Sequence, residues 1–344
     1  MADSDFRSPR AVRAALAARV EHGIFGYTVP PEELRAAIVE RLSSRYGWRV
    51  DPSWIVFLPG VVPALHVSAR RLLAPHEHAL VPTPLYQHFK RALELAPRAY
   101  SEIPLVLERG RWLFDLAALR AARTPKTRLL YLCNPQNPGG TVFRRDELVR
   151  LAEEARGCVI VSDEIHCDLV LDPSERHVPI ASVDPEISRR TVTLMSASKA
   201  FNIPSAGCAW AIAEDAALRE AMSADVRAHV LPSPSVFGYA ATLAALREAG
   251  AWLEAELAYL RGNRDLVEQE LPLPIAHVQA TYLAWIDCRS LAEDAYELFL
   301  RHGVALSPGS QFGAPGFVRL NFGTQRSRLA EALRRMRRAL GSSG

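Results

Sequence analysis

The chain has 344 residues, of which 49% are hydrophobic and 23% charged, with a formal net charge of +3. This composition is typical of a globular protein, and the length suits a large α/β domain plus a smaller one. No basic run interleaved with aromatics indicates nucleic-acid binding, and no apolar run predicts a membrane span or a signal peptide. The five cysteines form no CxxC pair, which argues against a metal site or a disulfide framework and predicts a cytoplasmic protein.

The N-terminal residues predict two helices joined by a turn-rich loop. Apolar periodicity predicts the first helix at 7–22 and the second at about 32–45, where Pro30-Pro31 provides the start signal. The loop between them carries Tyr27 beside glycine. We expect this N-terminal helical segment, residues 1–45, to pack with the smaller C-terminal domain.

From residue 54 to about 213, short apolar strands alternate with helices, which predicts a mostly parallel sheet covered on both faces. After residue 231, helices at about 234–270, three short strands and a C-terminal helix at about 327–340 predict a smaller α+β domain. We therefore place a large domain at 46–240 and a small C-terminal domain at 241–344.

Several residues with chemical potential follow the predicted strands at their ends. They are Gly60, Tyr86, Asn137, Asp163 and Lys199. Ligands of α/β proteins bind at the carboxyl ends of the strands, so we expect these residues to share one site. Each has an ordinary explanation as a turn, cap or ion pair, but five such explanations would have to coincide at one edge of the sheet.

Lys199 is the centre of this predicted site. It follows the apolar run 191–195, where poor hydration can lower the pKa of its amine and make it a nucleophile toward a carbonyl. It is one of three lysines among 41 lysines and arginines, so arginine supplies most of the positive charge. A lysine here suggests chemistry that needs the loss of a proton. Taken alone, a phosphate contact or a solvated loop lysine is an equally good interpretation.

Together, these residue types fit one cofactor, pyridoxal 5′-phosphate. A lysine can form a Schiff base with an aldehyde, an aspartate can keep a pyridinium protonated, and a tyrosine can stack on a planar ring. An asparagine amide can donate to a phenolate oxygen. A glycine turn at a helix N-terminus can bind a phosphate together with the hydroxyls of Ser196 and Ser198.

With these motifs, the chain resembles the fold-type-I pyridoxal-phosphate enzymes of the aminotransferase superfamily, and within them the MalY/PatB-type cystathionine β-lyase group. The resemblance covers nearly the whole chain. The matching segments are 22–27, 83–86, 134–138, 162–166, 196–199, 202–204, 280–285 and 317–321. The resemblance implies an α/β fold whose large domain holds a mostly parallel, seven-stranded sheet covered by helices, with a smaller α+β domain.

The resemblance also implies a role for each residue of the cofactor site. Lys199 would hold the cofactor and then act on the substrate Cα, Asp163 would pair with the pyridine nitrogen, and Asn137 with the phenolate oxygen. Tyr86 would stack on the ring and is the second candidate catalytic residue, and His166 is a further candidate cofactor contact. The candidate phosphate-binding residues are Gly60, Val61, Val62, Ser196 and Ser198.

The substrate and the partner subunit are expected to meet other residues. Arg319 would grip the substrate carboxylate in a bidentate fork, with Tyr282 and Asn321 as further candidate substrate contacts. A surface ion pair is the alternative for Arg319, but its apolar neighbours on a predicted strand favour the site. Tyr27 would reach the phosphate of the neighbouring subunit, which implies a homodimer.

His166 bears on the choice of reaction. Aminotransferases of the superfamily usually have tyrosine three residues after the pyridine aspartate, and a histidine there is similar to the carbon–sulfur lyases. The resemblance implies β-elimination of a cystathionine-like S-substituted L-cysteine to thiol, pyruvate and ammonia. Departures from the family pattern favour a specialised substrate, such as a bulky conjugate in natural-product metabolism. An aminotransferase is the second interpretation, followed by a decarboxylating or oxidatively deaminating enzyme acting on a related conjugate. A regulatory binding protein ranks last.

Gly207 departs from the family pattern. Many relatives have a basic residue eight positions after the lysine, where it contacts the phosphate. With glycine there, the phosphate would depend more on backbone and hydroxyl donors.

Overall fold

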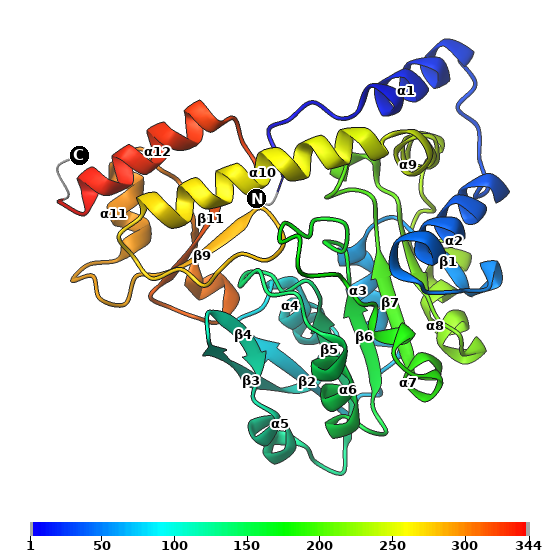
Figure 1. Ribbon diagram of the computed structural model, residues 1–344. Coiled ribbons are helices and arrows are strands. Elements are labelled where there is room, and N and C mark those ends of the chain that lie inside the picture. Colours follow the sequence, from blue (N-terminus) through cyan, green and yellow to red (C-terminus); the bar gives the residue numbers. More distant parts are fainter. Residues whose placement is uncertain (1–2, 342–344) are drawn as a thin grey trace.

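A twisted sheet with helices on both faces forms the centre of the molecule in the computed structural model, which describes residues 3–341 (Figure 1). Within that range the sheet has eight strands in the order β1-β8-β7-β6-β5-β2-β3-β4. The strands are β1 (Ile55–Leu58), β2 (His78–Thr83), β3 (Ala99–Glu108), β4 (Arg111–Phe114), β5 (Thr127–Cys133), β6 (Val159–Asp163), β7 (Thr191–Met195) and β8 (Ala209–Ile212).

The directions of these strands bring the predicted site residues to one edge. Strands β3, β2, β5, β6 and β7 pair in parallel. Strand β8 is antiparallel to both β7 and β1, so β1 runs in the same direction as β7. Strands β1, β2, β5, β6 and β7 therefore end on the same side of the sheet, and the mostly parallel, helix-covered architecture predicted from the sequence is confirmed.

The number of strands corrects the prediction of seven. Strand β3 is ten residues long: its first part, 99–104, pairs with β2, and its last part, 105–108, pairs with β4. Arg109 and Gly110 have φ of 50° and 78°, the positive values that a tight hairpin turn requires. The turn brings the chain back as β4, which adds an eighth strand at the edge.

Alternating side chains of the strands explain the two helical layers. On β5, Leu129 and Tyr131 pack toward one face, whereas Leu130 and Leu132 pack toward the other. The first face is covered by α3 (Val61–Arg71), α4 (His88–Leu95) and α8 (Ala216–Arg227), and the second by α5 (Leu116–Ala122), α6 (Arg145–Glu154) and α7 (Pro185–Arg189).

The N-terminal helices and the C-terminal part share a further apolar cluster. Its helices are α1 (Arg10–His22), α2 (Glu32–Tyr46), α9 (Val236–Glu248), α10 (Gly250–Glu270), α11 (Ala295–Arg301) and α12 (Arg326–Ala339). They accompany an antiparallel sheet in the order β10 (Ser307–Pro308), β11 (Phe317–Asn321) and β9 (Leu283–Asp287). Helices α1 and α2 pack on α9. The predicted boundary between residues 240 and 241 falls inside α9, and the domain boundaries stay a prediction.

The start of the described chain is held against this C-terminal part. Phe6 packs edge-to-face on Tyr259 of α10, with ring centroids 5.3 Å apart, and Asp5 donates its backbone N–H to the carbonyl of Gly323. Figure 1 accordingly shows the first described residues beside α10. In the described part of the chain, no helix combines the length and the apolarity that a membrane crossing needs.

Candidate active site

A cavity of about 500 Å³ lies at the sheet edge where the strands end. Residues from separate segments line it: Gly60 after β1, Tyr86 after β2, Asn137 after β5, Asp163 at the end of β6 and Lys199 after β7. Arg319 of β11 enters from the smaller sheet. The structure thus places all five strand-end residues and the predicted carboxylate-binding arginine beside one cavity.

Lys199 follows β7, whose five residues are all buried. Its Nζ lies 3.4 Å from a carboxylate oxygen of Asp3. Burial lowers the pKa of Lys199, and the carboxylates of Asp3 and Asp163 act against that shift. The lowered pKa increases the fraction of free amine near neutral pH, as a nucleophilic lysine requires.

Asp163 is a buried carboxyl group with few partners. Its Oδ1 accepts a hydrogen bond of 3.0 Å from the backbone N–H of Ile165. Burial raises the pKa of Asp163 to about 7, which the hydrogen bond from Ile165 and the charge of Lys199 only partly offset. A cationic N–H donor that entered the cavity would stabilise the ionised carboxylate.

Asn137 and Arg319 lie 182 residues apart in sequence and are joined in space. The Arg319 guanidinium donates from Nη1 to Asn137 Oδ1 at 3.0 Å and from Nη2 to Ser307 Oγ at 3.3 Å, and it lies over the Phe312 ring. Burial lowers its pKa to about 10. Its buried Nε has no hydrogen-bond partner among the described residues. The arginine therefore retains binding capacity for an anionic group in the cavity.

The predicted phosphate-binding residues surround the start of α3. Gly60 is the N-cap of this helix, and Val61 and Val62 present first-turn backbone N–H groups at the cavity. Ser198 also lines the cavity. Ser196 lines it too, but its hydroxyl donates to the Cys208 carbonyl at 2.7 Å, so its proton is already used within the chain.

Gly207 also lines this part of the cavity, and its conformation explains the departure from the family pattern. Its φ is 64°, in the left-handed region that favours glycine. A basic side chain at this position would strain the backbone, so the helix end and Ser198 carry more of the predicted anion site.

Some predicted site residues do not line the cavity. His166 is buried with its ring 6.2 Å from that of Tyr282, which is also buried and does not line the cavity. Burial, together with the nearby cations Lys199 and Arg319, lowers the pKa of His166 to about 3, so the imidazole stays neutral. Asn321 donates from Nδ2 to the Asp3 carbonyl at 2.7 Å, which anchors the N-terminal residues.

Tyr27 lies on the loop between α1 and α2 and is fully exposed. It does not line the cavity of its own chain. Its predicted contact with a neighbouring subunit stays a prediction.

Sequence reasoning missed several residues of the cavity. Asp3, Gln87, His88, Ser307, Gln311 and Phe312 all line it. Asp3 lies before the first helix in a segment without periodicity, so only the fold reveals its place. Among residues 3–341, no group of three or more His, Cys, Asp or Glu side chains could hold a metal ion.

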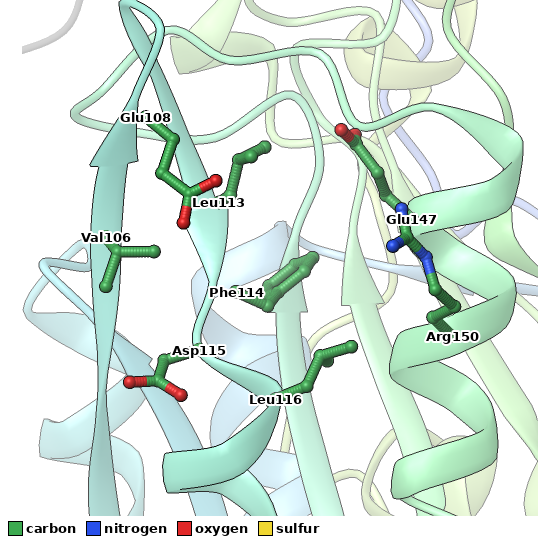
Figure 2. A pocket seen from close by; sticks show the side chains of 8 residues that line it. All are labelled: Val106, Glu108, Leu113, Phe114, Asp115, Leu116, Glu147 and Arg150. Atoms are coloured by element: carbon green, nitrogen blue, oxygen red, sulfur yellow. The ribbon is translucent and has the colours of Figure 1, made fainter.

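A second cavity, of about 400 Å³, lies between the β3–β4 hairpin and α6 and contains none of the predicted site residues (Figure 2). Three of its polar side chains, Asp115, Glu147 and Arg150, have structural partners. Asp115 caps α5 by accepting from the Ala118 N–H, and Glu147 and Arg150 of α6 form ion pairs with Arg111 and Asp146. The cavity at the sheet edge is therefore the stronger candidate for chemistry.

Known proteins are similar to this chain over almost its whole length. The chain is 34% identical to cystathionine β-lyase PatB of Bacillus subtilis (strain 168), over 99% of this chain and 91% of that protein. The structure matches OvoB with a TM-score of 0.96 and 42% identity, covering 100% of this chain and 92% of that one. It matches the pyridoxal-phosphate-bound C–S lyase of Staphylococcus hominis with a TM-score of 0.91 and 30% identity, covering 99% and 90%.

The family model described as aminotransferase class I and II matches residues 2–336. This match spans the sheet, the cavity and the smaller sheet that carries Arg319. As the sequence motifs predicted, the chain belongs to the aminotransferase class I and II family.

Proposed function

We propose that this chain is a pyridoxal-phosphate-dependent carbon–sulfur β-lyase that cleaves an S-substituted L-cysteine to a thiol, pyruvate and ammonia. The observation that carries this proposal is the convergence of Lys199, Asp163 and the Asn137–Arg319 pair on one cavity. The lyase names of PatB and of the Staphylococcus hominis protein support the choice of reaction.

The side chains present fit the cofactor. The buried carboxyl of Asp163 suits a pyridine N–H, because a positive donor would stabilise its ionised form. Arg319 donates to Asn137 Oδ1, which leaves the amide Nδ2 as the donor for a phenolate oxygen. The start of α3 and Ser198 suit a phosphate. When bound, pyridoxal phosphate supplies an electron sink for the charge that develops at the substrate Cα.

The protein's own residues would then position the substrate and move protons. Arg319 binds the substrate carboxylate, which fixes the orientation of the Cα–H bond toward Lys199. The Lys199 amine removes the Cα proton, the Cβ–S bond breaks, and the sulfur leaves with the bonding electron pair and becomes a thiol on protonation. Hydrolysis of the remaining three-carbon unit gives pyruvate and ammonia.

The fork geometry of the Arg319 guanidinium should affect the KM for the substrate. Replacement of Arg319 by lysine would remove the fork geometry and one charge-assisted hydrogen bond. We expect KM to rise about tenfold, which corresponds to about 1.4 kcal/mol. Steady-state kinetics with one S-substituted cysteine measures this change.

The reaction itself is tested by product analysis. The holoenzyme is incubated with cystathionine and a panel of S-alkyl and S-aryl cysteines, without any added keto acid. Equal amounts of thiol and pyruvate support the lyase. Amino-group transfer that needs an acceptor keto acid and releases no thiol contradicts it in favour of an aminotransferase, and carbon dioxide or hydrogen peroxide release would indicate the decarboxylating or oxidative alternative.

We also propose that the chain acts as a homodimer in which Tyr27 completes the neighbouring cavity. Tyr27 is exposed together with Ile24, Phe25 and Val29 on the loop before α2, an apolar group that suits a protein interface. Light scattering should give the mass of two chains. Tyr27→Phe should weaken cofactor binding without changing that mass, and a monomer with full cofactor affinity would contradict this arrangement. The cytoplasmic location stays a prediction.

A further inference from the structure

Asp3 reaches the catalytic cavity from a segment far from the sheet edge in sequence. Its carboxylate oxygen lies 3.4 Å from Lys199 Nζ, across 196 residues of chain, and its side chain lines the cavity and is 44% exposed. A carboxylate at this distance from a lysine that must gain and lose a proton can influence the position and charge of the amine.

The position of Asp3 is determined by hydrogen bonds of the segment that carries it. Asn321 donates to the Asp3 carbonyl at 2.7 Å, and Asn202 Nδ2 donates to the carbonyls of Ser4 and Phe6 at 2.9 and 2.6 Å. Asn202 lies three residues after Lys199, so the N-terminal segment is attached to the same loop as the lysine. The side chains of Asp3 and Lys199 are therefore held in fixed positions relative to each other.

A second contact fixes the outer side of the segment. The Asp5 carboxylate accepts hydrogen bonds from Thr324 Oγ1 at 2.7 Å and from Arg328 Nη1 at 2.8 Å, both in the C-terminal part of the chain. Asp5 thus points to a different group of partners from Asp3, although only one residue separates them. This difference provides a matched control within the same segment.

We propose that Asp3 is a positioning residue for Lys199: its carboxylate orients the Nζ group and stabilises the ammonium form that arises when the free amine takes up a proton. The proposal rests on the proposed role of Lys199 as the proton-transferring amine. In this arrangement, Asp3 stabilises the ammonium that forms when Lys199 takes the Cα proton. Asp3 also keeps the protonated Nζ beside the cavity, where the proton is available for a later proton transfer.

Other charges around Lys199 make this counter-ion necessary. Burial and the positive charge of Arg319 disfavour the ammonium form, whereas Asp3 and Asp163 favour it. Asp163 is assigned to the pyridine nitrogen in the proposed holoenzyme, and His166 stays neutral. Asp3 is then the carboxylate on the described chain that can respond to the charge of Lys199 during turnover.

The test uses the reactivity of Lys199 in the protein without cofactor. Trace acetylation with acetic anhydride over pH 6–10, quantified by peptide mass spectrometry, gives the pH midpoint of each lysine, and the exposed Lys126 is the internal reference. We expect Asp3→Asn to shift the Lys199 midpoint downward by about one pH unit. Asp3→Glu should restore most of the shift, and Asp5→Asn should leave the midpoint unchanged.

An unchanged Lys199 midpoint in folded Asp3→Asn, or an equal shift in Asp5→Asn, would overturn the proposal. Circular dichroism establishes that each variant is folded. Acetylation needs neither cofactor nor substrate. The acetylation result therefore tests the role of Asp3 even if the protein shows no lyase activity.

The holoenzyme gives a second readout. Asp3→Asn should lower kcat about tenfold for every substrate in the panel and shift the pH optimum, with KM nearly unchanged. A loss confined to substrates with a cationic S-substituent would instead make Asp3 a direct substrate contact and contradict the positioning role.

Discussion

Two aspartates five residues apart, Asp163 and Asp168, are both buried but have opposite surroundings. Asp163, at the end of β6, accepts from one backbone N–H and lines the cavity, and burial raises its pKa to about 7. Burial acts on Asp168 as well, but Arg41 and Arg45 outweigh it and bring the pKa of Asp168 below its ordinary value. Tyr46 also donates to Asp168.

The Asp163 carboxyl can still bind a cationic ligand, whereas the Asp168 carboxyl is already paired within the chain. The Asp168 cluster, which comprises Asp168, Arg41, Arg45 and Tyr46, joins α2 to the loop after β6 and has ion-pair distances of 2.8 and 3.0 Å. Because its charges are paired within the chain, removal of one partner should reduce stability. Asp163 leaves part of its charge unsatisfied and should contribute to activity instead.

The largest effect is expected at the lysine beside Asp163. Lys199→Ala should lower turnover by at least about a thousandfold, because the nucleophile and the proton-transferring base are both lost. The visible absorbance of bound cofactor in covalent linkage should disappear. Thermal unfolding should remain cooperative, and retention of turnover within tenfold would contradict the assignment.

Replacement of the unsatisfied aspartate should be the next largest effect. Asp163→Asn should lower kcat about a hundredfold, because the pyridine nitrogen loses its anionic partner. The folded state of the cofactor-free protein holds the Asp163 proton up to pH about 7, whereas the unfolded chain releases it near the ordinary value, so stability falls as pH rises between those values. The variant should therefore be no less stable than the parent at pH 8, as measured by urea unfolding.

The paired aspartate should show the reverse pattern. Asp168→Asn should reduce the free energy of unfolding by about 3 kcal/mol, because two guanidinium groups lose their buried partner. The pKa of Asp168 is lowered on folding, so its contribution is present above the ordinary carboxyl pKa and is lost as pH falls through the folded value. The difference between variant and parent should shrink in acid, while kcat at pH 7 stays within about threefold.

The smallest effect is expected at Glu256 of α10, a buried carboxyl without a charged partner among the described residues, where only the Ser4 hydroxyl acts against the effect of burial. Burial raises its pKa to about 8, so the folded state loses stability as pH rises from the ordinary value toward 8. Glu256→Gln should raise Tm by about 2–4 °C at pH 9, the equivalent of about 1 kcal/mol. At pH 5, where the carboxyl is protonated, Tm should not change; an equal gain at both pH values would assign the effect to packing.

The sequence predicted the part of the site that local patterns specify. Lys199, Asp163 and Asn137 each follow a strand whose apolar run is visible in sequence, and parallel pairing makes such ends coincide. Strand β4 was not predicted, because it depends on a long β3 that extends past its neighbour and turns back.

Local sequence patterns did not predict the contacts between distant segments. The Asn137–Arg319 hydrogen bond and the Asp3–Lys199 ion pair depend on how the smaller sheet and the N-terminal segment dock on the large sheet. Residues of this kind, such as Asp3 and Phe312, have no periodicity or spacing that marks them. The hydrogen bond from the Ser196 hydroxyl to the Cys208 carbonyl is a further contact that no local pattern indicates, and the phosphate-binding role of Ser196 stays a prediction.

The most direct test of the account is to locate the cofactor on the chain. The protein is reconstituted with pyridoxal phosphate, reduced with borohydride and digested, and the modified peptide is identified by mass spectrometry. We predict a pyridoxyl phosphate adduct on Lys199, with Lys90 and Lys126 unmodified. The Lys199→Ala protein should carry no adduct. Stoichiometric modification at Lys90 or Lys126, or no adduct after reconstitution, would contradict the central claim that the sheet-edge cavity is the cofactor site.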